Sequence, residues 1–139
     1  MPGLPVRGGV AVPGFLRKLG GRPGDVLLVP DPDLRPFAAG TAVVRKAPRE
    51  GKVRGVVFRP RRRDEIPQDL RRYRELIEED GFIWAVIPKK AAIEALGRDV
   101  TFEDVIELAL RTDLVDNKTL TFSEREYGVR LVVRRHLRR

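Results

Sequence analysis

Apolar residues in the first 60 positions fall into short runs bounded by Gly, Pro and Asp. In chain order these runs read GGVAV, DVLLV, GTAVV and VRGVVF. Runs rich in β-branched residues between turn residues predict β-strands. The segment GFLRKLGG, about one helical turn closed by glycines, separates the first two runs. The pattern is typical of a small barrel or sandwich.

The hydrophobic period changes after residue 65. Apolar residues then recur at helical spacing, which predicts an amphipathic helix that ends before Gly81. FIWAVI predicts a buried strand, KKAAIEAL a short helix, and Thr101 the N-cap of a third helix. Two strand-like runs, TLTF and YGVRLVVRRHL, follow. The residues that set the helical period of the first helix are Ile66, Leu70, Tyr73 and Ile77.

The expected fold class is therefore α+β. Residues 1–63 are predicted to form a small β-barrel with a basic hairpin, and residues 64–139 a mixed region of amphipathic helices and strands that packs on it. A length of 139 residues allows one domain or two small ones.

Cysteine is absent from the chain, which excludes disulfides, thiolate nucleophiles and thiolate-bound metals. No apolar run has the length of about 18 residues that a membrane helix needs, and the N-terminus lacks the apolar core of a signal peptide. We therefore expect a soluble, cytoplasmic protein with no membrane partner. Ser, Gln and Asn occur once each while 35% of the residues are charged, a composition typical of heat-adapted proteins.

The net charge of +8 is distributed unevenly along the chain. Residues 1–63 carry 14 Lys and Arg against 4 Asp and Glu, residues 64–115 carry 7 against 13, and residues 116–139 carry 7 against 3. This basic, acidic, basic layout predicts that the first and last segments face a polyanion, while the acidic middle either packs within the fold or meets a protein partner.

Short motifs in the first segment resemble the RNA-binding PUA domain of pseudouridine synthases and archaeosine transglycosylases. The resemblance covers roughly residues 8–58 and implies a pseudo-barrel that binds structured RNA. That family usually opens with a strand and a helix, for which this chain has only twelve residues. Either the module is trimmed or a late strand such as GVRLVV completes the barrel. The matching positions are Pro13-Gly14, Gly24-Asp25, Ala38-x-Gly40-x-Ala42 and Gly51-Lys52.

The same stretch, VAVPGFLRKLGGRPGDVLLV, is also similar to the swapped-hairpin DNA-binding domain of the AbrB type. That resemblance implies a dimeric transcriptional regulator with interleaved strands, and it ranks second because AAGTA has no counterpart in it. A third hypothesis is a structural assembly subunit that makes no nucleic-acid contact.

Arginine and lysine supply the predicted nucleic-acid site, because guanidinium groups match the geometry of phosphates. Their core is the run VVFRPRRRDE, with further basic residues before it and near the C-terminus. The alternative is that these arginines lie on the solvent-exposed surface and form ion pairs with carboxylates of the same chain, without binding nucleic acid. The predicted RNA-binding residues are Arg7, Arg45, Lys46, Arg49, Lys52, Arg54, Arg59, Arg61, Arg62, Arg63, Arg134 and Arg135.

Catalytic motifs find little support in the sequence. His136 lies in a basic tail, and Ser123 has no His and Asp partners at a recognisable spacing. We therefore predict a protein that is not an enzyme and has no catalytic residues, cofactor or metal. The leading hypothesis is non-catalytic binding of tRNA or rRNA within an RNA modification or processing assembly, with DNA as the alternative partner.

Overall fold

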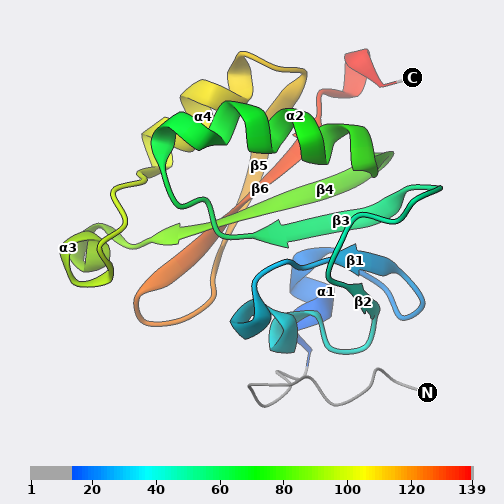
Figure 1. The fold of residues 1–139 in the computed structure, drawn as a ribbon, viewed down its shortest axis with the longest axis horizontal. Coiled ribbons are helices and arrows are strands. Elements are labelled where there is room, and N and C mark those ends of the chain that lie inside the picture. The colour runs from blue at the N-terminus through cyan, green and yellow to red at the C-terminus, as the bar shows by residue number, and fades with distance from the viewer. Residues whose placement is uncertain (1–13, 139) are drawn as a thin grey trace.

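The computed structural model describes residues 14–138, whose strands form one open, six-stranded sheet (Figure 1). The strand order is β2-β1-β3-β4-β6-β5. The strands are β1 (Val26–Leu28), β2 (Ala42–Val44), β3 (Val53–Phe58), β4 (Ile77–Pro88), β5 (Leu114–Thr121) and β6 (Glu126–Val133).

Helices connect these strands and cover the sheet. The α-helices are α1 (Phe15–Leu19), α2 (Ile66–Leu76), α3 (Ile93–Leu96) and α4 (Phe102–Leu110). Four 3-10 segments complete the described chain: η1 (Pro32–Ala38), η2 (Arg63–Glu65), η3 (Lys90–Ala92) and η4 (Arg135–Leu137).

The sheet is mixed, and its direction changes at β6. β1 pairs in parallel with β2 and β3, and β3 pairs in parallel with β4. β6 runs antiparallel to both β4 and β5. The predicted small barrel is therefore wrong: β2 and β5 are the two outer strands of a sheet that does not close.

The reason for this error is the direction of the connections. A hairpin turn reverses the chain, whereas parallel strands need a crossover of a dozen or more residues. Residues 29–41, which include η1, carry the chain from β1 back to a parallel β2, and α2 does the same between β3 and β4. β3 belongs to the first predicted domain and β4 to the second, so the predicted boundary at residue 63 falls inside one sheet.

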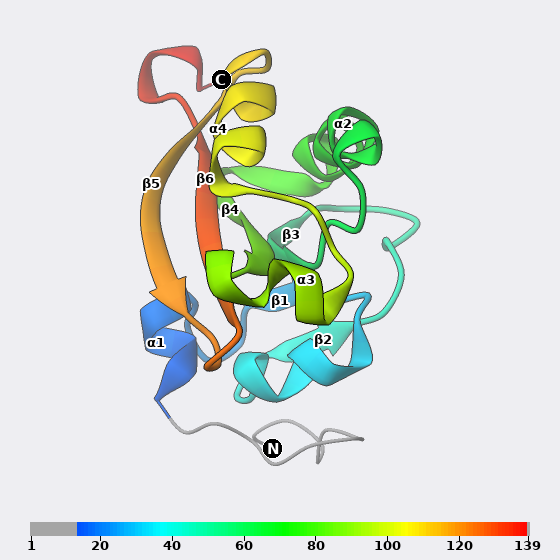
Figure 2. The ribbon, with the colours of Figure 1, turned by 90° about the vertical axis from the view of Figure 1, so that its left-hand side faces the viewer.

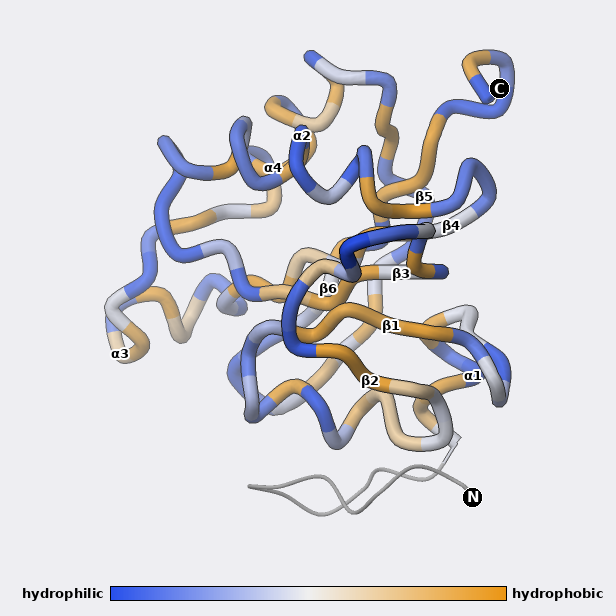
Figure 3. The backbone as a smooth tube through the Cα atoms, turned by 45° about the vertical axis from the view of Figure 1, so that its right-hand side comes forward, coloured by the Kyte–Doolittle hydropathy of each residue, from blue (hydrophilic) through white to orange (hydrophobic). Residues whose placement is uncertain are grey.

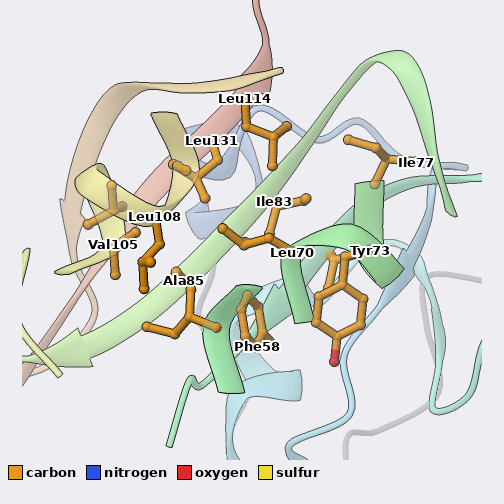
Figure 4. Packing of buried hydrophobic residues seen from close by; sticks show 14 of the residues in the cluster. Phe58, Leu70, Tyr73, Ile77, Ile83, Ala85, Val105, Leu108, Leu114 and Leu131 are labelled. Carbon is orange, nitrogen blue, oxygen red and sulfur yellow. The ribbon is translucent and has the colours of Figure 1, made fainter. Parts of the chain in front are cut away.

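The α2 and α4 helices cover one face of the sheet (Figure 2). Along β4, alternate residues point to this face, and Ile83, Ala85 and Ile87 are at most 1% exposed. Figure 4 shows Leu70 and Tyr73 of α2 on the same side of the sheet as Ile83 and Ala85. The ring centroids of Tyr73 and Phe58 are 4.7 Å apart. This packing confirms the amphipathic helix predicted from Ile66, but the helix ends at Leu76, and Ile77, the last residue of the predicted period, is the first residue of β4.

The α1 helix and η1 cover the opposite face. Phe82, Trp84 and Val86 of β4 point to this side and are completely buried. The Trp84 Nε1–H group donates a hydrogen bond of 2.9 Å to the Leu19 carbonyl at the end of α1. Figure 3 shows the apolar residues concentrated along the inner strands and the hydrophilic residues along the loops. With both faces covered, β4 is buried on both sides, as expected for a central parallel strand.

The α4 helix begins at the predicted Thr101 cap. Thr101 Oγ1 accepts a hydrogen bond of 3.1 Å from the Asp104 amide, and Asp104 Oδ2 accepts one of 3.0 Å from the Thr101 amide. This capping box satisfies two amides that the helix leaves without partners.

Within residues 14–138, no helix is both long and apolar enough to cross a membrane.

Candidate functional site at the carboxyl edge of the sheet

The carboxyl ends of the four parallel strands meet at one edge of the sheet. β2 lies on one side of β1, and β3 and β4 lie on the other side. The order of the strands therefore reverses between β1 and β3, and this position is the topological switch point of the sheet. Open α/β sheets bind ligands in the crevice outside such a switch point. Asp31 follows β1 and Arg59 follows β3, so both residues lie at the position where the topology places a site. Their contact is direct, since Asp31 Oδ2 accepts a 2.9 Å hydrogen bond from the Arg59 amide.

A buried ion-pair network fills the middle of this edge. Arg59 donates to Glu126 through Nε (2.7 Å) and Nη2 (2.8 Å), and its Nη1 contacts both Asp33 oxygens at 2.8 and 2.9 Å. Arg98 donates to the same Glu126 carboxylate and to the Val86 carbonyl. The Arg59, Arg98 and Glu126 side chains are only 12%, 11% and 14% exposed. The network thus connects the ends of β3 and β4, the start of β6 and the loop after α3.

Burial and hydrogen bonding oppose each other in this network. Burial alone would raise the pKa of Glu126, but the hydrogen bonds from Arg59 and Arg98 outweigh it and lower that pKa. Burial also opposes the charged form of Arg59, yet its bonds with Glu126 and Asp33 prevail and raise its pKa. For Arg98 burial prevails, and the pKa of this guanidinium is lowered. Glu126 is therefore held as a carboxylate between two guanidinium groups.

A small hollow of about 190 Å³ lies at the switch point itself. Residues from the ends of β1 and β3 and from the first turns of α2 line it. Burial is the main cause that raises the pKa of two of them, the Asp69 carboxyl and the Tyr73 hydroxyl. The lining residues are Pro30, Asp31, Phe58, Arg59, Arg61, Glu65, Asp69 and Tyr73.

A larger hollow of about 430 Å³ lies beside the first, and the two share Arg61. The loop after β3 and the loop after α3 form its walls. Its volume falls within the range of about 300–1,000 Å³ that small-molecule sites occupy. Both guanidinium and carboxylate groups line it, and the lining residues are Arg61, Arg62, Arg63, Asp64, Gly97 and Asp99.

Five arginines predicted to bind RNA form ion pairs with carboxylates. Because each is paired with its own acidic neighbour, they do not form a free cationic surface. The pairs are Arg54 with Glu78 and Asp80, Arg59 with Asp33 and Glu126, Arg61 with Asp31, Arg62 with Asp64, and Arg63 with Asp104 and Glu107.

The other predicted RNA-binding residues lie apart from this group. Arg45, Lys46 and Arg49 are exposed after β2. Lys52 donates to the Glu75 carbonyl, Arg134 donates to the Leu110 carbonyl at 2.7 Å, and Arg135 is exposed in η4. Arg7 lies outside the described residues. The structure separates the set, because Arg54, Arg134 and Arg135 lie toward the amino edge of the parallel strands and Arg45, Arg59 and Arg61–Arg63 at the carboxyl edge.

The sequence analysis did not predict the carboxylates that lie at this edge of the sheet. Asp31, Asp99 and Glu126 were assigned no role, Asp64 was considered only as an ion-pair partner of the arginine run, and Arg98 was not noticed. One signal could have found Asp31: it stands two residues beyond an apolar run, where a parallel strand would place a ligand-binding residue. Among residues 14–138, no group of three or more His, Asp or Glu side chains could hold a metal ion.

Comparison with known proteins gives structural matches only. No protein-family model and no curated protein matches the sequence. The O-methyltransferase NcsB1 from neocarzinostatin biosynthesis, in complex with S-adenosylmethionine (SAM), matches with a TM-score of 0.62 at 14% identity over 81% of this chain and 49% of its own. A putative type 11 methyltransferase from Sulfolobus solfataricus matches with a TM-score of 0.59 at 10% identity over 91% and 94%.

A third match, described as a pericyclic reaction enzyme, has a TM-score of 0.53 at 14% identity and covers 86% of this chain and 39% of its own. The chain therefore spans two fifths to a half of the larger matched chains and nearly all of the Sulfolobus one. At these identities the likeness shows the fold alone. The fold is an open α/β sheet that resembles those of SAM-dependent methyltransferases.

These findings correct three predictions. The PUA and AbrB resemblances are wrong, because the matched structures have a methyltransferase-like sheet. Non-catalytic RNA binding is contradicted, because the matched structures are enzymes by name, and the prediction of a protein that is not an enzyme is contradicted with it. The protein partner expected at the acidic middle segment stays a prediction.

The residues after β1 and β2 do not fit the adenosine part of SAM. Nucleoside sites in doubly wound sheets use a glycine-rich turn after the first strand and a carboxylate after the second. Here Pro30, Asp31 and Pro32 follow β1, and Arg45 and Lys46 follow β2. Glycine is absent from residues 25–39, and a basic pair occupies the position where ribose hydroxyls would need an acceptor.

Proposed function

We propose that the protein is an enzyme that binds, in the larger hollow, a small molecule carrying both an ammonium and a carboxylate group, such as an amino acid or its derivative. The observation that carries this proposal is the mixture of exposed guanidinium and carboxylate groups around one hollow of suitable size. A purely anionic ligand would meet Asp64 and Asp99, and a purely cationic one would meet Arg61 and Arg62. Only a ligand of both charges matches both kinds of group.

The guanidinium wall of the hollow is available to a ligand carboxylate. Arg61 and Arg62 are 65% and 72% exposed, and each contacts one carboxylate, on Asp31 and Asp64 respectively. An arginine offers five N–H donors, so donors remain on both. Exposed ion pairs contribute at most about 1 kcal/mol. A ligand carboxylate that replaces Asp64 beside Arg62 therefore loses little.

The opposite wall offers an acceptor for the ammonium group. Asp99 is exposed on the hollow, and within residues 14–138 it has no hydrogen bond or ion pair of its own. Gly97 adds no side chain to this wall, and the space beside it is open, because a Cβ placed there would have no other atom within 4 Å. Charge-assisted hydrogen bonds to ammonium are among the stronger ones that a carboxylate makes.

The names of the matched structures favour an enzyme. Methyl transfer from SAM is the activity that most of those names suggest, so SAM is titrated in a separate experiment, together with adenosine. A location in the cytoplasm, expected from the absence of cysteine, forms part of this proposal.

The test is a titration of the ¹⁵N-labelled chain followed by amide chemical shifts. Glycine and L-glutamate serve as ligands with both charges, and acetate and methylammonium as ligands with one. We expect saturable shifts at Arg62, Gly97 and Asp99 with the amino acids and none with the single charges at equal ionic strength. Shifts that acetate reproduces, or the absence of any saturable shift, would reject the proposal.

Three variants locate the site in that titration. Arg62→Gln and Asp99→Asn each remove one wall and should weaken amino-acid binding at least tenfold, the loss of about one charged hydrogen bond. Arg71→Gln removes a charge of the same sign from the exposed face of α2, away from the hollow, and should leave binding unchanged.

A further inference from the structure

The nucleoside end of the crevice is occupied by side chains of the protein itself. In this fold that end lies between the loop after β1 and the loop after β2. We infer that Arg35 and Asp31 close it, so that the chain does not hold the adenosine part of SAM or of a related cofactor. This inference does not depend on the proposed amino-acid site, which lies in the larger hollow on the far side of Arg61.

Arg35 closes the loop after β1 from the η1 side. Its Nε donates to the Val29 carbonyl and its Nη2 to the Pro30 carbonyl, both at 3.1 Å. These two carbonyls stand directly after β1, where the backbone of a nucleoside-binding loop approaches its ligand. The guanidinium therefore takes the position of a ligand against this turn.

Prolines remove the donors that a ligand would need on the same loop. Pro30 and Pro32 have no N–H group. Glycines allow a backbone to approach a bound group closely, and none stands between Gly24 and Gly40. The loop therefore has few backbone N–H donors for a ligand, and its proline rings keep the backbone away from a bound group.

Both oxygens of Asp31 already accept a hydrogen bond from the protein, which leaves them less available to ribose hydroxyls. Its Oδ2 accepts the Arg59 amide at 2.9 Å and its Oδ1 accepts Arg61 Nη2 at 3.1 Å. Its side chain is 12% exposed. The residues directly after β2 are Arg45 and Lys46, so no carboxylate stands at the end of that strand. The hollow that remains at the switch point, about 190 Å³, is smaller than the usual range of about 300–1,000 Å³ for small-molecule sites.

The first experiment titrates SAM and adenosine into the full chain by calorimetry and by amide chemical shifts. We expect no saturable change at residues 29–35 or 43–46 up to about 1 mM ligand. Saturable shifts of those amides, accompanied by binding heat, would overturn the inference. The proposed amino-acid site is read at Arg62, Gly97 and Asp99, so either proposal can fail without the other.

The second experiment tests the closure itself by hydrogen exchange. Arg35→Ala removes both bonds to the turn, so we expect the amides of Val29 and Asp31 to exchange at least tenfold faster than in the unsubstituted protein. Arg22→Ala, which truncates an exposed arginine before β1, should leave those rates unchanged. Equal rates at Val29 and Asp31 in all three proteins would show that Arg35 does not hold the loop and would overturn the inference.

Discussion

Arg59 holds the Glu126 carboxylate through two parallel hydrogen bonds, Nε to Oε2 at 2.7 Å and Nη2 to Oε1 at 2.8 Å. The pair joins the end of β3 to the start of β6, 67 residues further along the chain. Arg98 reaches the same carboxylate from the loop after α3. One acidic side chain thus pairs with two buried guanidinium groups at the candidate site.

Removal of the Glu126 charge should destabilise the protein strongly. Glu126→Gln leaves Arg59 and Arg98 buried without their shared carboxylate, which costs about 3–5 kcal/mol in comparable pairs. Urea unfolding followed by circular dichroism measures this change. Asp64→Asn is the control, since Asp64 and Arg62 are both 72% exposed and their pair contributes less than about 1 kcal/mol. Equal losses in the two variants would contradict the network's importance.

Glu126 also predicts a direction for the pH dependence of stability. Its pKa is lowered in the folded state, so its stabilisation is complete above the carboxyl pKa of the unfolded chain, about 4.3. The contribution is lost as the pH falls through the lower, folded-state value. The free energy of unfolding should therefore decrease less steeply below pH about 4.3 in Glu126→Gln than in the unsubstituted protein. A slope that the substitution leaves unchanged would show that Glu126 is not shifted.

Loss of the cap at Thr101 should weaken α4. Thr101→Ala removes the oxygen that accepts the Asp104 amide and is expected to cost about 1 kcal/mol. Thr101→Ser keeps the hydroxyl and should retain most of that stability. Thermal unfolding of the two variants gives the comparison, and indistinguishable midpoints would argue that the cap contributes nothing.

A substitution at Gly128 tests how tightly β6 packs against the hydrophobic cluster on the face of the sheet that α1 covers. A Cβ at this position would lie 2.6 Å from Phe122 Cε1 and 2.8 Å from Trp84 Cε3, closer than atoms can pack. Gly128→Ala should therefore destabilise the protein by about 1–3 kcal/mol. Thr119→Ala, on an exposed position of β5, should change stability by less than about 0.5 kcal/mol. A neutral Gly128→Ala would mean that the rings move aside freely.

Local elements were predictable from the sequence because their causes are local. The spacing of Ile66, Leu70 and Tyr73 predicts the buried side of α2, and Thr101 predicts the start of α4. The run FIWAVI predicts a strand buried on both faces, and β4 is that strand.

Strand direction was not predictable in the same way. β1 and β2 were placed within one or two residues, but a short apolar run looks the same in a parallel and an antiparallel pair. What makes them parallel is η1, a 3-10 segment with prolines that reads as a turn.

The ion-pair partners of the predicted arginines were not predictable for a related reason. Arg59 pairs with Asp33 and Glu126, 26 and 67 residues away in the chain, so the charge of a segment does not reveal which arginines stay free.

Trp84 is the sole tryptophan of the chain, completely buried, and its indole N–H group is bonded to the last residue of α1. The protein therefore contains a single tryptophan, which can be excited selectively over the two tyrosines and which lies at the contact between that short helix and the sheet. Detachment of α1 alone would admit water to the indole and shift its emission to longer wavelength while the remaining secondary structure persists. An emission change that precedes global melting would thus identify α1 as the first part of the molecule to open.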